Sequence, residues 1–100
     1  MATVVFGDFE WDDEKARANL AKHGVSFEEA CTVFLDLDYL LWPDAKAPDR
    51  FAALGYSELA RLLFVVHVER GERLRIISGR RATRRERMTY EARRRPGPFS

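Results

Sequence analysis

The stretch Lys22-His23-Gly24-Val25-Ser26-Phe27-Glu28-Glu29 ends one predicted helix and begins the next. Gly24 can adopt the left-handed conformation that closes a helix, because it has no Cβ to clash with the backbone. Ser26 and Glu29 have the spacing of a capping box, which satisfies free N–H groups at a helix start. The stretch therefore predicts two helices in succession, separated by a sharp turn.

Upstream of this stretch, the pattern predicts one short strand followed by the first helix. Residues 3–9 alternate weakly between apolar and polar side chains, as a half-buried strand does. Asp12 can cap a helix whose first turn carries the carboxylates of Asp13 and Glu14, which favour the positive end of the helix dipole. We expect the first helix over residues 13–23.

Downstream, the second helix is predicted to bury one face, since its apolar residues recur at helical spacing. These residues are Phe27, Ala30, Cys31, Phe34 and Leu35. The next segment, residues 36–49, contains two prolines and is predicted to be a loop.

The C-terminal half is predicted to hold three strands and a last helix. Residues 50–56, 62–68 and 74–80 have strand composition, and the short links between them favour an antiparallel meander. Thr83 and Glu86 have the spacing of a second capping box, and the helix that they begin should end near residue 93. The predicted fold class is α+β, in the order strand, two helices, three-stranded meander, helix.

Length and composition limit the architecture. A chain of 100 residues that is 46% hydrophobic fits one domain, which we place over residues 1–95 with a flexible tail over 96–100. The single cysteine, Cys31, cannot form an internal disulfide, and no apolar run reaches the roughly 20 residues of a membrane span. The N-terminus does not resemble a secretion signal. We therefore expect a cytoplasmic protein with no membrane partner.

Charge is distributed unevenly, although the formal net charge is only +1. Carboxylates crowd residues 8–14, whereas arginines crowd residues 80–95. One interpretation is a belt of surface salt bridges, each worth little. The other is a basic pole that meets an anionic substrate and an acidic pole that meets a basic protein.

Polar residues follow one side of the first predicted helix, at i, i+4, i+7 and i+8. They are Lys15, Asn19, Lys22 and His23. The pattern places this stripe in solvent, opposite Ala16 and Leu20, and an ordinary solvated face is the simplest interpretation. His23 favours a functional role for this stripe instead. Carbonyl groups in the last turn of a helix favour a protonated imidazole, which can transfer protons.

Arginines surround the junction between the last strand and the last helix. Arg84 and Arg85 stand in the first helical turn, where a positive charge opposes the helix dipole, so helix stability does not explain them. Arg80 and Arg81 close the preceding strand on its opposite faces, and guanidinium groups beside a helix start can bind phosphate. For any single arginine, pairing with the acidic segment near Asp12 is the alternative.

Other reactive side chains are predicted to be structural. His67 lies in a strand that is apolar on both sides, and Cys31 lies on the apolar face of the second helix. No spacing of His, Cys or carboxylates indicates a metal site, and no glycine-rich loop indicates a cofactor. Trp11, Trp42 and Tyr90 could stack on bases or border the core. We expect neither a metal nor a cofactor.

Two segments taken together resemble the BrnT family of type II toxins. The first is Phe9-Glu10-Trp11-Asp12 with Lys15, Asn19 and residues 22–27, and the second is Arg75–Ser78 with residues 80–86. The similarity covers residues 9–91. It implies a RelE-like fold, ribonuclease activity and a BrnA-like antitoxin that blocks the toxin. The antitoxin would carry the DNA-binding element, so operator DNA is reached only through it, and a homodimer within the toxin–antitoxin complex is left open.

The resemblance also implies which residues act. By position, Lys22 and His23 belong to the active face, supported by the RNA contacts of Lys15 and Asn19. The catalytic set includes Arg80 and Arg81 as phosphate contacts, while Arg84 and Arg85 bind flanking phosphates. The chain departs from the family pattern at Ala60, where a glycine is expected, and at Gly79, where alanine is more common.

The reaction expected from these residues is metal-independent cleavage of RNA, which would inhibit translation. His23 would take one proton-transfer role, while Lys22 and either Arg80 or Arg81 would stabilise charge on the phosphorus. The second acid or base stays open among Glu58, Glu86 and Tyr90. The alternatives are a non-enzymatic nucleic-acid-binding or co-repressor subunit that acts through a DNA-binding partner, and an interaction domain with no nucleic-acid role.

Overall fold

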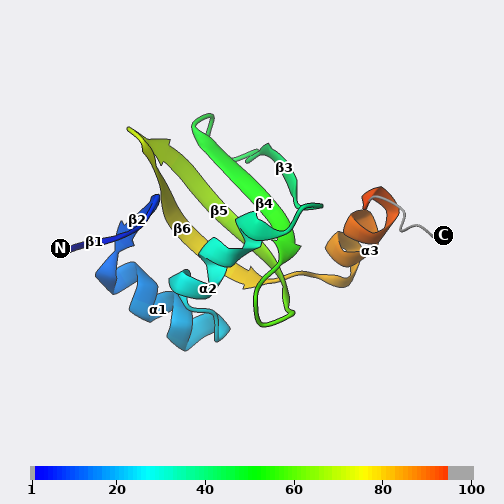
Figure 1. Cartoon of the computed structure of the whole chain (residues 1–100), viewed down its shortest axis with the longest axis horizontal. Helices are drawn as coiled ribbons and strands as arrows, with labels where there is room; N and C mark the ends of the chain where they lie inside the picture. The colour runs from blue at the N-terminus through cyan, green and yellow to red at the C-terminus, as the bar shows by residue number, and fades with distance from the viewer. Residues whose placement is uncertain (1, 95–100) are drawn as a thin grey trace.

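One mixed sheet of six strands, flanked by helices, forms the body of the protein (Figure 1). The computed structural model describes residues 2–94. In chain order the elements are β1 (Thr3–Phe6), β2 (Phe9–Asp12), α1 (Asp13–His23), α2 (Phe27–Cys31), the 3-10 helix η1 (Thr32–Leu35), β3 (Leu40–Pro43), β4 (Arg50–Tyr56), β5 (Leu62–Arg70), β6 (Arg73–Arg81) and α3 (Arg84–Arg93). The α+β class is confirmed.

The sheet is larger than the predicted three-stranded meander. Its strand order is β1-β2-β6-β5-β4-β3, and neighbours are antiparallel except for β2 and β6, which are parallel. The meander of β4, β5 and β6 is therefore the centre of the sheet, and three short strands extend it at both edges.

The structure at both edges of the sheet differs from the sequence prediction. The strand expected over residues 3–9 is a hairpin instead, in which Val4 pairs with Trp11 and the chain turns at Gly7 and Asp8. The loop expected over residues 36–49 contains β3, which pairs with β4 from Leu40 to Pro43. Strands of four residues show too little alternation between apolar and polar side chains to be recognised from the sequence. Pro43 is tolerated in β3 because this strand lies at the edge of the sheet.

Helix ends follow the local capping signals. Asp12 accepts a hydrogen bond from the backbone N–H of Lys15 (3.1 Å), and Gly24 ends α1 with a φ of 67°. Ser26 accepts from the backbone N–H of Glu29 (3.0 Å) at the start of α2. The predicted bounds of α1, residues 13–23, are confirmed.

The second helix is shorter than predicted, because the chain changes to a 3-10 turn after Cys31. A 3-10 turn has three residues per turn rather than 3.6, so the side chains rotate relative to an α-helical face. Phe34 is accordingly only half-buried, and Leu35 is 77% exposed rather than part of the core.

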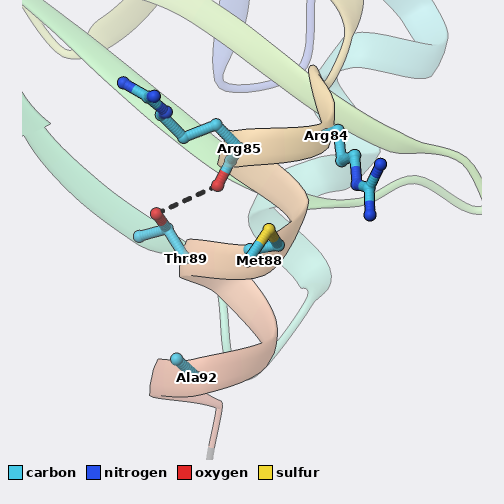
Figure 2. A pocket seen from close by; sticks show the side chains of 5 residues that line it. All are labelled: Arg84, Arg85, Met88, Thr89 and Ala92. Carbon is cyan, nitrogen blue, oxygen red and sulfur yellow. Dashed lines mark hydrogen bonds between the residues drawn. The ribbon is translucent and has the colours of Figure 1, made fainter.

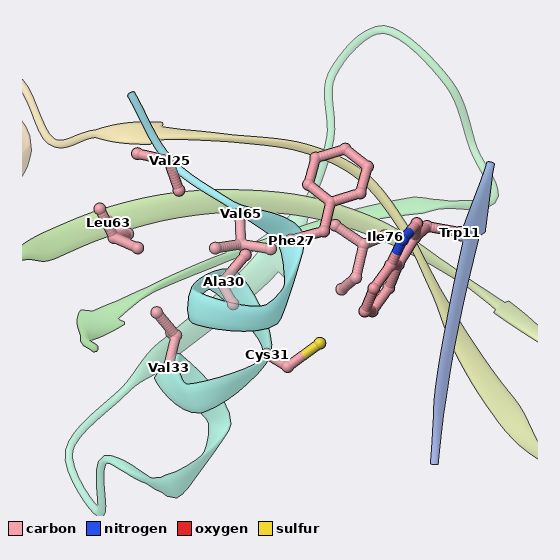
Figure 3. Close-up of a cluster of buried hydrophobic side chains, with 10 residues drawn as sticks. Trp11, Val25, Phe27, Ala30, Cys31, Val33, Leu63, Val65 and Ile76 are labelled. Atoms are coloured by element: carbon pink, nitrogen blue, oxygen red, sulfur yellow. The ribbon is translucent and has the colours of Figure 1, made fainter. Parts of the chain in front are cut away.

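The main core lies between the sheet and the two N-terminal helices (Figure 3). It joins Trp11, Val25, Phe27, Ala30, Cys31, Val33, Ala53, Leu63, Val65 and Ile76. The rings of Trp11 and Phe27 meet edge to face at 5.9 Å, which is a favourable aromatic geometry. This core anchors α1 and α2 on one face of the sheet and so sets where the polar side of α1 lies.

The last helix lies at the other end of the sheet (Figure 1). A second, smaller cluster joins Tyr90 of α3 to Leu54 and Leu62 of the sheet. The capping box predicted at Thr83 and Glu86 is present with both of its hydrogen bonds. The described chain measures 48 × 26 × 26 Å along its principal axes, so α3 extends the molecule instead of closing over its centre.

Two expectations concern the ends of the chain and membranes. The tail predicted over residues 96–100 lies outside the described residues. None of the helices within residues 2–94 combines the length and the apolar character needed to cross a bilayer.

Candidate functional site

A shallow depression of about 240 Å³ lies between α1 and β6. It is lined by Lys15, Ala18, Asn19, Lys22, His23, Ile77 and Ser78. Helical spacing brings the α1 residues to one side, and β6 offers an open edge because its pairing with β2 stops at Arg75. The structure thus brings all four polar residues of the predicted α1 stripe to one place.

Asn19 does not face solvent as the pattern suggested. Its side chain is buried, with 8% exposure, and its amide nitrogen donates to the carbonyl oxygens of Val25 (2.9 Å) and Gly79 (2.8 Å). Its amide oxygen accepts from the backbone N–H of Gly79 (3.1 Å). Leu20, expected on the buried side, is 52% exposed. The buried side of α1 is therefore rotated toward Asn19, and this polar contact with β6 decides the rotation.

A second depression, of about 400 Å³, lies on the face of the sheet opposite the N-terminal helices. It is lined by Asp44, Lys46, Arg50, Phe64, Val66, Ile77, Ser78 and Arg80. Ile77 and Ser78 line both depressions, because they stand on the exposed edge of β6. The depression beside α1 and the depression on the sheet face therefore meet at Ile77 and Ser78.

Arg80 is held firmly in the second depression. Its guanidinium lies over the ring of Phe64, 4.3 Å from the centroid, and donates two hydrogen bonds of 2.8 Å to Glu86. These hydrogen bonds lower the pKa of Glu86, although partial burial opposes the shift. Arg80 is thus fixed on this face of the sheet, and its charge is partly compensated by the carboxylate of Glu86.

The other predicted arginines lie elsewhere. Arg81 pairs with Leu63, whose side chain belongs to the core beneath the N-terminal helices, so Arg81 stands on the face opposite Arg80. Arg84 and Arg85 lie on α3 and point to different sides of it (Figure 2). They border an open surface with Met88, Thr89 and Ala92. None of these three arginines lines the two depressions at β6.

The residues proposed as a second acid or base also lie outside these depressions. Glu86 is engaged by Arg80 and by the backbone N–H of Thr83. Tyr90 donates a hydrogen bond of 2.6 Å to Asp36, and burial together with that carboxylate raises its pKa above the ordinary value. In this arrangement neither group is poised to exchange a proton with a substrate beside His23.

Four polar residues that line the second depression were not predicted as site residues from the sequence: Asp44, Lys46, Arg50 and Ser78. The motif Arg75–Ser78 contained a signal for Ser78, because it belonged to the family resemblance. Lys46 and Arg50 carried no such signal, since they share this depression with β6 only because β4 pairs with β5 and β5 pairs with β6.

The acidic N-terminal segment forms one ion pair with the sheet among the described residues. Glu10 pairs with Arg75 at 2.6 Å across β2 and β6. Arg17 pairs with Asp13 within α1 itself. A continuous belt of salt bridges between the two poles is therefore not formed by residues 2–94.

His67 and Cys31 are structural, as expected. His67 is buried among Phe34 and neighbouring strands, with ring centroids 5.0 Å apart, and desolvation lowers its pKa. Burial raises the pKa of the Cys31 thiol to about 12. Within residues 2–94 no three His, Cys, Asp or Glu side chains gather in a way that could hold a metal ion.

Comparison with known proteins identifies the family. The model of the family described as "Ribonuclease toxin, BrnT, of type II toxin-antitoxin system" matches residues 11–86. The 1.1 Å crystal structure of the Brucella abortus ribonuclease toxin BrnT shares 28% sequence identity with the chain, at a TM-score of 0.61, over 74% of this chain and 94% of that one. No curated protein matches. The chain belongs to the BrnT family of ribonuclease toxins of type II toxin–antitoxin systems.

Proposed function

We propose that this chain is a metal-independent endoribonuclease whose cleavage of RNA inhibits translation, and that a BrnA-like antitoxin neutralises it. The observation that carries the proposal is the meeting of two cationic depressions at Ile77 and Ser78. One contributes the imidazole of His23 and the ammonium of Lys22, and the other the guanidinium of Arg80. An imidazole can transfer a proton and the cations can stabilise negative charge on the phosphate, and phosphodiester cleavage uses both effects.

The reaction would begin at the 2′-hydroxyl of the RNA. Its proton leaves, the oxygen attacks the adjacent phosphorus, and the bond to the 5′-oxygen breaks as that oxygen gains a proton. The products are a 2′,3′-cyclic phosphate and a free 5′-hydroxyl. His23 would carry out one of the two proton transfers, and Lys22 and Arg80 would stabilise the charge on the non-bridging oxygens.

The remaining predicted residues would bind the RNA on either side. Lys15 borders the first depression. Asn19, which also lines it, is the exception, because the carbonyl groups of Val25 and Gly79 engage both hydrogens of its amide. Arg81, Arg84 and Arg85 continue the basic character toward α3 and could contact flanking phosphates. Between Arg80 and Arg81, the position of Arg80 beside Ser78 favours it as the residue at the cleaved phosphate.

The catalytic assignment is tested by comparing RNA cleavage by the parent with that by His23→Ala and Arg80→Ala. We expect losses of about 100-fold or more for His23→Ala, since general acid–base catalysis contributes that much. Arg17→Ala is the control, because Arg17 is an exposed cation of α1 outside both depressions. Parent-like rates for both site variants would refute the assignment.

Metal independence has a separate test. Cleavage by the parent should continue at an unchanged rate after dialysis against excess chelator. Loss of activity that returns on adding a divalent cation would show that a metal takes part.

The antitoxin and the DNA role are tested outside the cleavage assay. Expression of the chain alone should arrest growth, and co-expression of a BrnA-like partner should relieve the arrest. The alternative is a co-repressor that binds nucleic acid without cutting it; it predicts salt-sensitive RNA binding and intact RNA. We further propose that the chain binds operator DNA only through the antitoxin and that its fold is related to that of RelE-like toxins. A homodimer within the toxin–antitoxin complex would be detected from the mass of that complex.

A further inference from the structure

We infer that Asn19 is a positioning residue, which sets the distance between the reactive groups of α1 and the edge of β6. The inference rests on the proposed function, since it assigns a role within the same depression. Asn19 has three hydrogen bonds of 2.8–3.1 Å, and all of them go to backbone atoms outside α1. One side chain therefore holds together the three segments that surround His23.

The first of these segments is β6, at a point where β5 is paired with one side of the strand and no strand is paired with the other. Pairing with β2 ends at Arg75, and at Gly79 the amide of Asn19 both donates to the carbonyl and accepts from the N–H. The amide thus satisfies the two backbone groups that an additional strand would satisfy. Ser78, which lines the depression, is the adjacent residue in the chain.

The second contact fixes the end of α1. The amide of Asn19 donates to the carbonyl of Val25, two residues after His23. Val25 in turn lies close to Gly79, because a Cβ added there would stand 3.4 Å from a methyl carbon of Val25. The turn that follows His23 is therefore pressed against the same residue of β6 that Asn19 binds.

The chemistry of the contact suits asparagine. It needs two donors for the carbonyls of Val25 and Gly79 and one acceptor for the N–H of Gly79. An aspartate of the same shape offers acceptors alone when it is ionised, and an alanine offers nothing. Because both amide hydrogens are already engaged, Asn19 has no donor left for RNA.

The expected signature of positioning is a loss of rate without a loss of binding. We expect Asn19→Ala to lower the kcat for RNA cleavage by about tenfold to 100-fold, because small misplacements of reacting groups have effects of this size. The KM should stay within about twofold of the parent value. Asn19→Asp keeps the shape of the side chain and should likewise lower kcat while KM changes little. It replaces Asn19→Ala as the test variant if Asn19→Ala fails to fold.

A matched control separates positioning from a general loss of stability. Ser57→Ala also removes a buried side-chain hydrogen bond, of 2.6 Å to Glu29, away from both depressions. All proteins are assayed well below their melting temperatures. A drop in kcat for the Asn19 variants and not for Ser57→Ala confirms the inference. Equal drops, or a raised KM with an unchanged kcat, overturn it.

Amide hydrogen exchange provides a readout that does not need cleavage. In Asn19→Ala the N–H of Gly79 should exchange faster, together with the amides of residues 22–25, while those of β4 and β5 keep their protection. Acceleration at Gly79 alone would overturn the positioning role. If the parent failed to cleave RNA, the proposed function would fall and the exchange pattern would still decide this inference.

Discussion

Ala60 occupies a backbone conformation that suits glycine. Its φ is 59°, in the left-handed region, within the turn that joins β4 to β5. The turn is closed by hydrogen bonds from the N–H of Ser57 to Arg61 and from the N–H of Ala60 to Ser57, both of 2.9 Å. The resemblance to the family led us to expect glycine at this position, and the geometry explains why, because a Cβ is disfavoured there.

Ala60→Gly should therefore stabilise the protein. Relief of the left-handed strain is worth about 1 kcal/mol, which corresponds to a rise in melting temperature of roughly 4–8 °C for a domain of this size. Thermal unfolding followed by circular dichroism measures it. The control is Ala52→Gly, in the buried part of β4, where the same exchange should destabilise. A lower melting temperature for Ala60→Gly would show that the turn holds no such strain.

The helix α3 depends on few contacts with the rest of the molecule. Tyr90 is its buried residue and donates a hydrogen bond to Asp36, and Arg87 donates one of 3.0 Å to the hydroxyl of Tyr56. The opposite side of α3, with Arg84 and Arg85, is open (Figure 2). The arginines that we propose to bind RNA are thus presented on an element that is held by one buried ring, which packs on Leu54 and Leu62, and by a few polar contacts.

Tyr90→Phe should loosen α3 selectively. It removes one hydrogen bond and keeps the ring, so the free energy of unfolding should fall by about 1 kcal/mol. Amides of α3 that are bonded within the helix should exchange faster, whereas those of α1 should not change. Hydrogen exchange by NMR distinguishes the two helices. Equal acceleration in both would mean that α3 unfolds only together with the whole domain.

An ion pair between a buried carboxylate and a partly exposed arginine connects distant parts of the molecule. Arg61, in the turn after β4, forms hydrogen bonds with Glu29 of α2 and donates to the carbonyl of Gly24 at the end of α1 (2.9 Å). Ser57 donates a further hydrogen bond to Glu29. The hydrogen bonds from Arg61 are the main cause that lowers the pKa of Glu29, against the effect of burial. The pair thus links both N-terminal helices to the sheet.

The free energy of unfolding should decrease in acid because of the ion pair between Arg61 and Glu29. A carboxyl group with a lower pKa in the folded protein stabilises it above its unfolded pKa of about 4.3, and that stabilisation is lost as the pH falls through the folded value. Glu86 contributes with the same sign. Glu29→Gln should lower the free energy of unfolding at pH 7 by about 2–3 kcal/mol and make it depend less on pH in the acid range.

Urea unfolding at several pH values between about 3 and 7 measures the effect. Glu72→Gln is the control, because Glu72 is exposed in the turn between β5 and β6. Parallel pH profiles for Glu29→Gln and the parent would show that Glu29 does not carry the acid dependence.

Local rules were sufficient for the helix ends and for the centre of the sheet. The ends of α1, the start of α2 and the start of α3 each depend on a side chain that bonds to backbone groups within three residues, or on a glycine at the end. The strands β4, β5 and β6 are rich in residues that favour strands and follow one another closely in the chain. Each of these signals is contained in a short window of the sequence, so the residues of that window are enough to predict the element.

Long-range pairing settled the sheet edges and the layout of the site. Glu10 pairs with Arg75, and Asn19 binds Gly79 sixty residues away. No short window contains both partners of such a contact, so the pairing of β2 with β6 and the burial of Asn19 could not be predicted from the motifs. Strand alternation, in contrast, is local, and it correctly placed Arg80 and Arg81 on opposite faces of β6. The sequence by itself determined which residue types are available for catalysis, because a side chain's chemistry does not depend on the fold. The tertiary structure decided which of these residues share one surface, because that depends on the packing of α1 against β6.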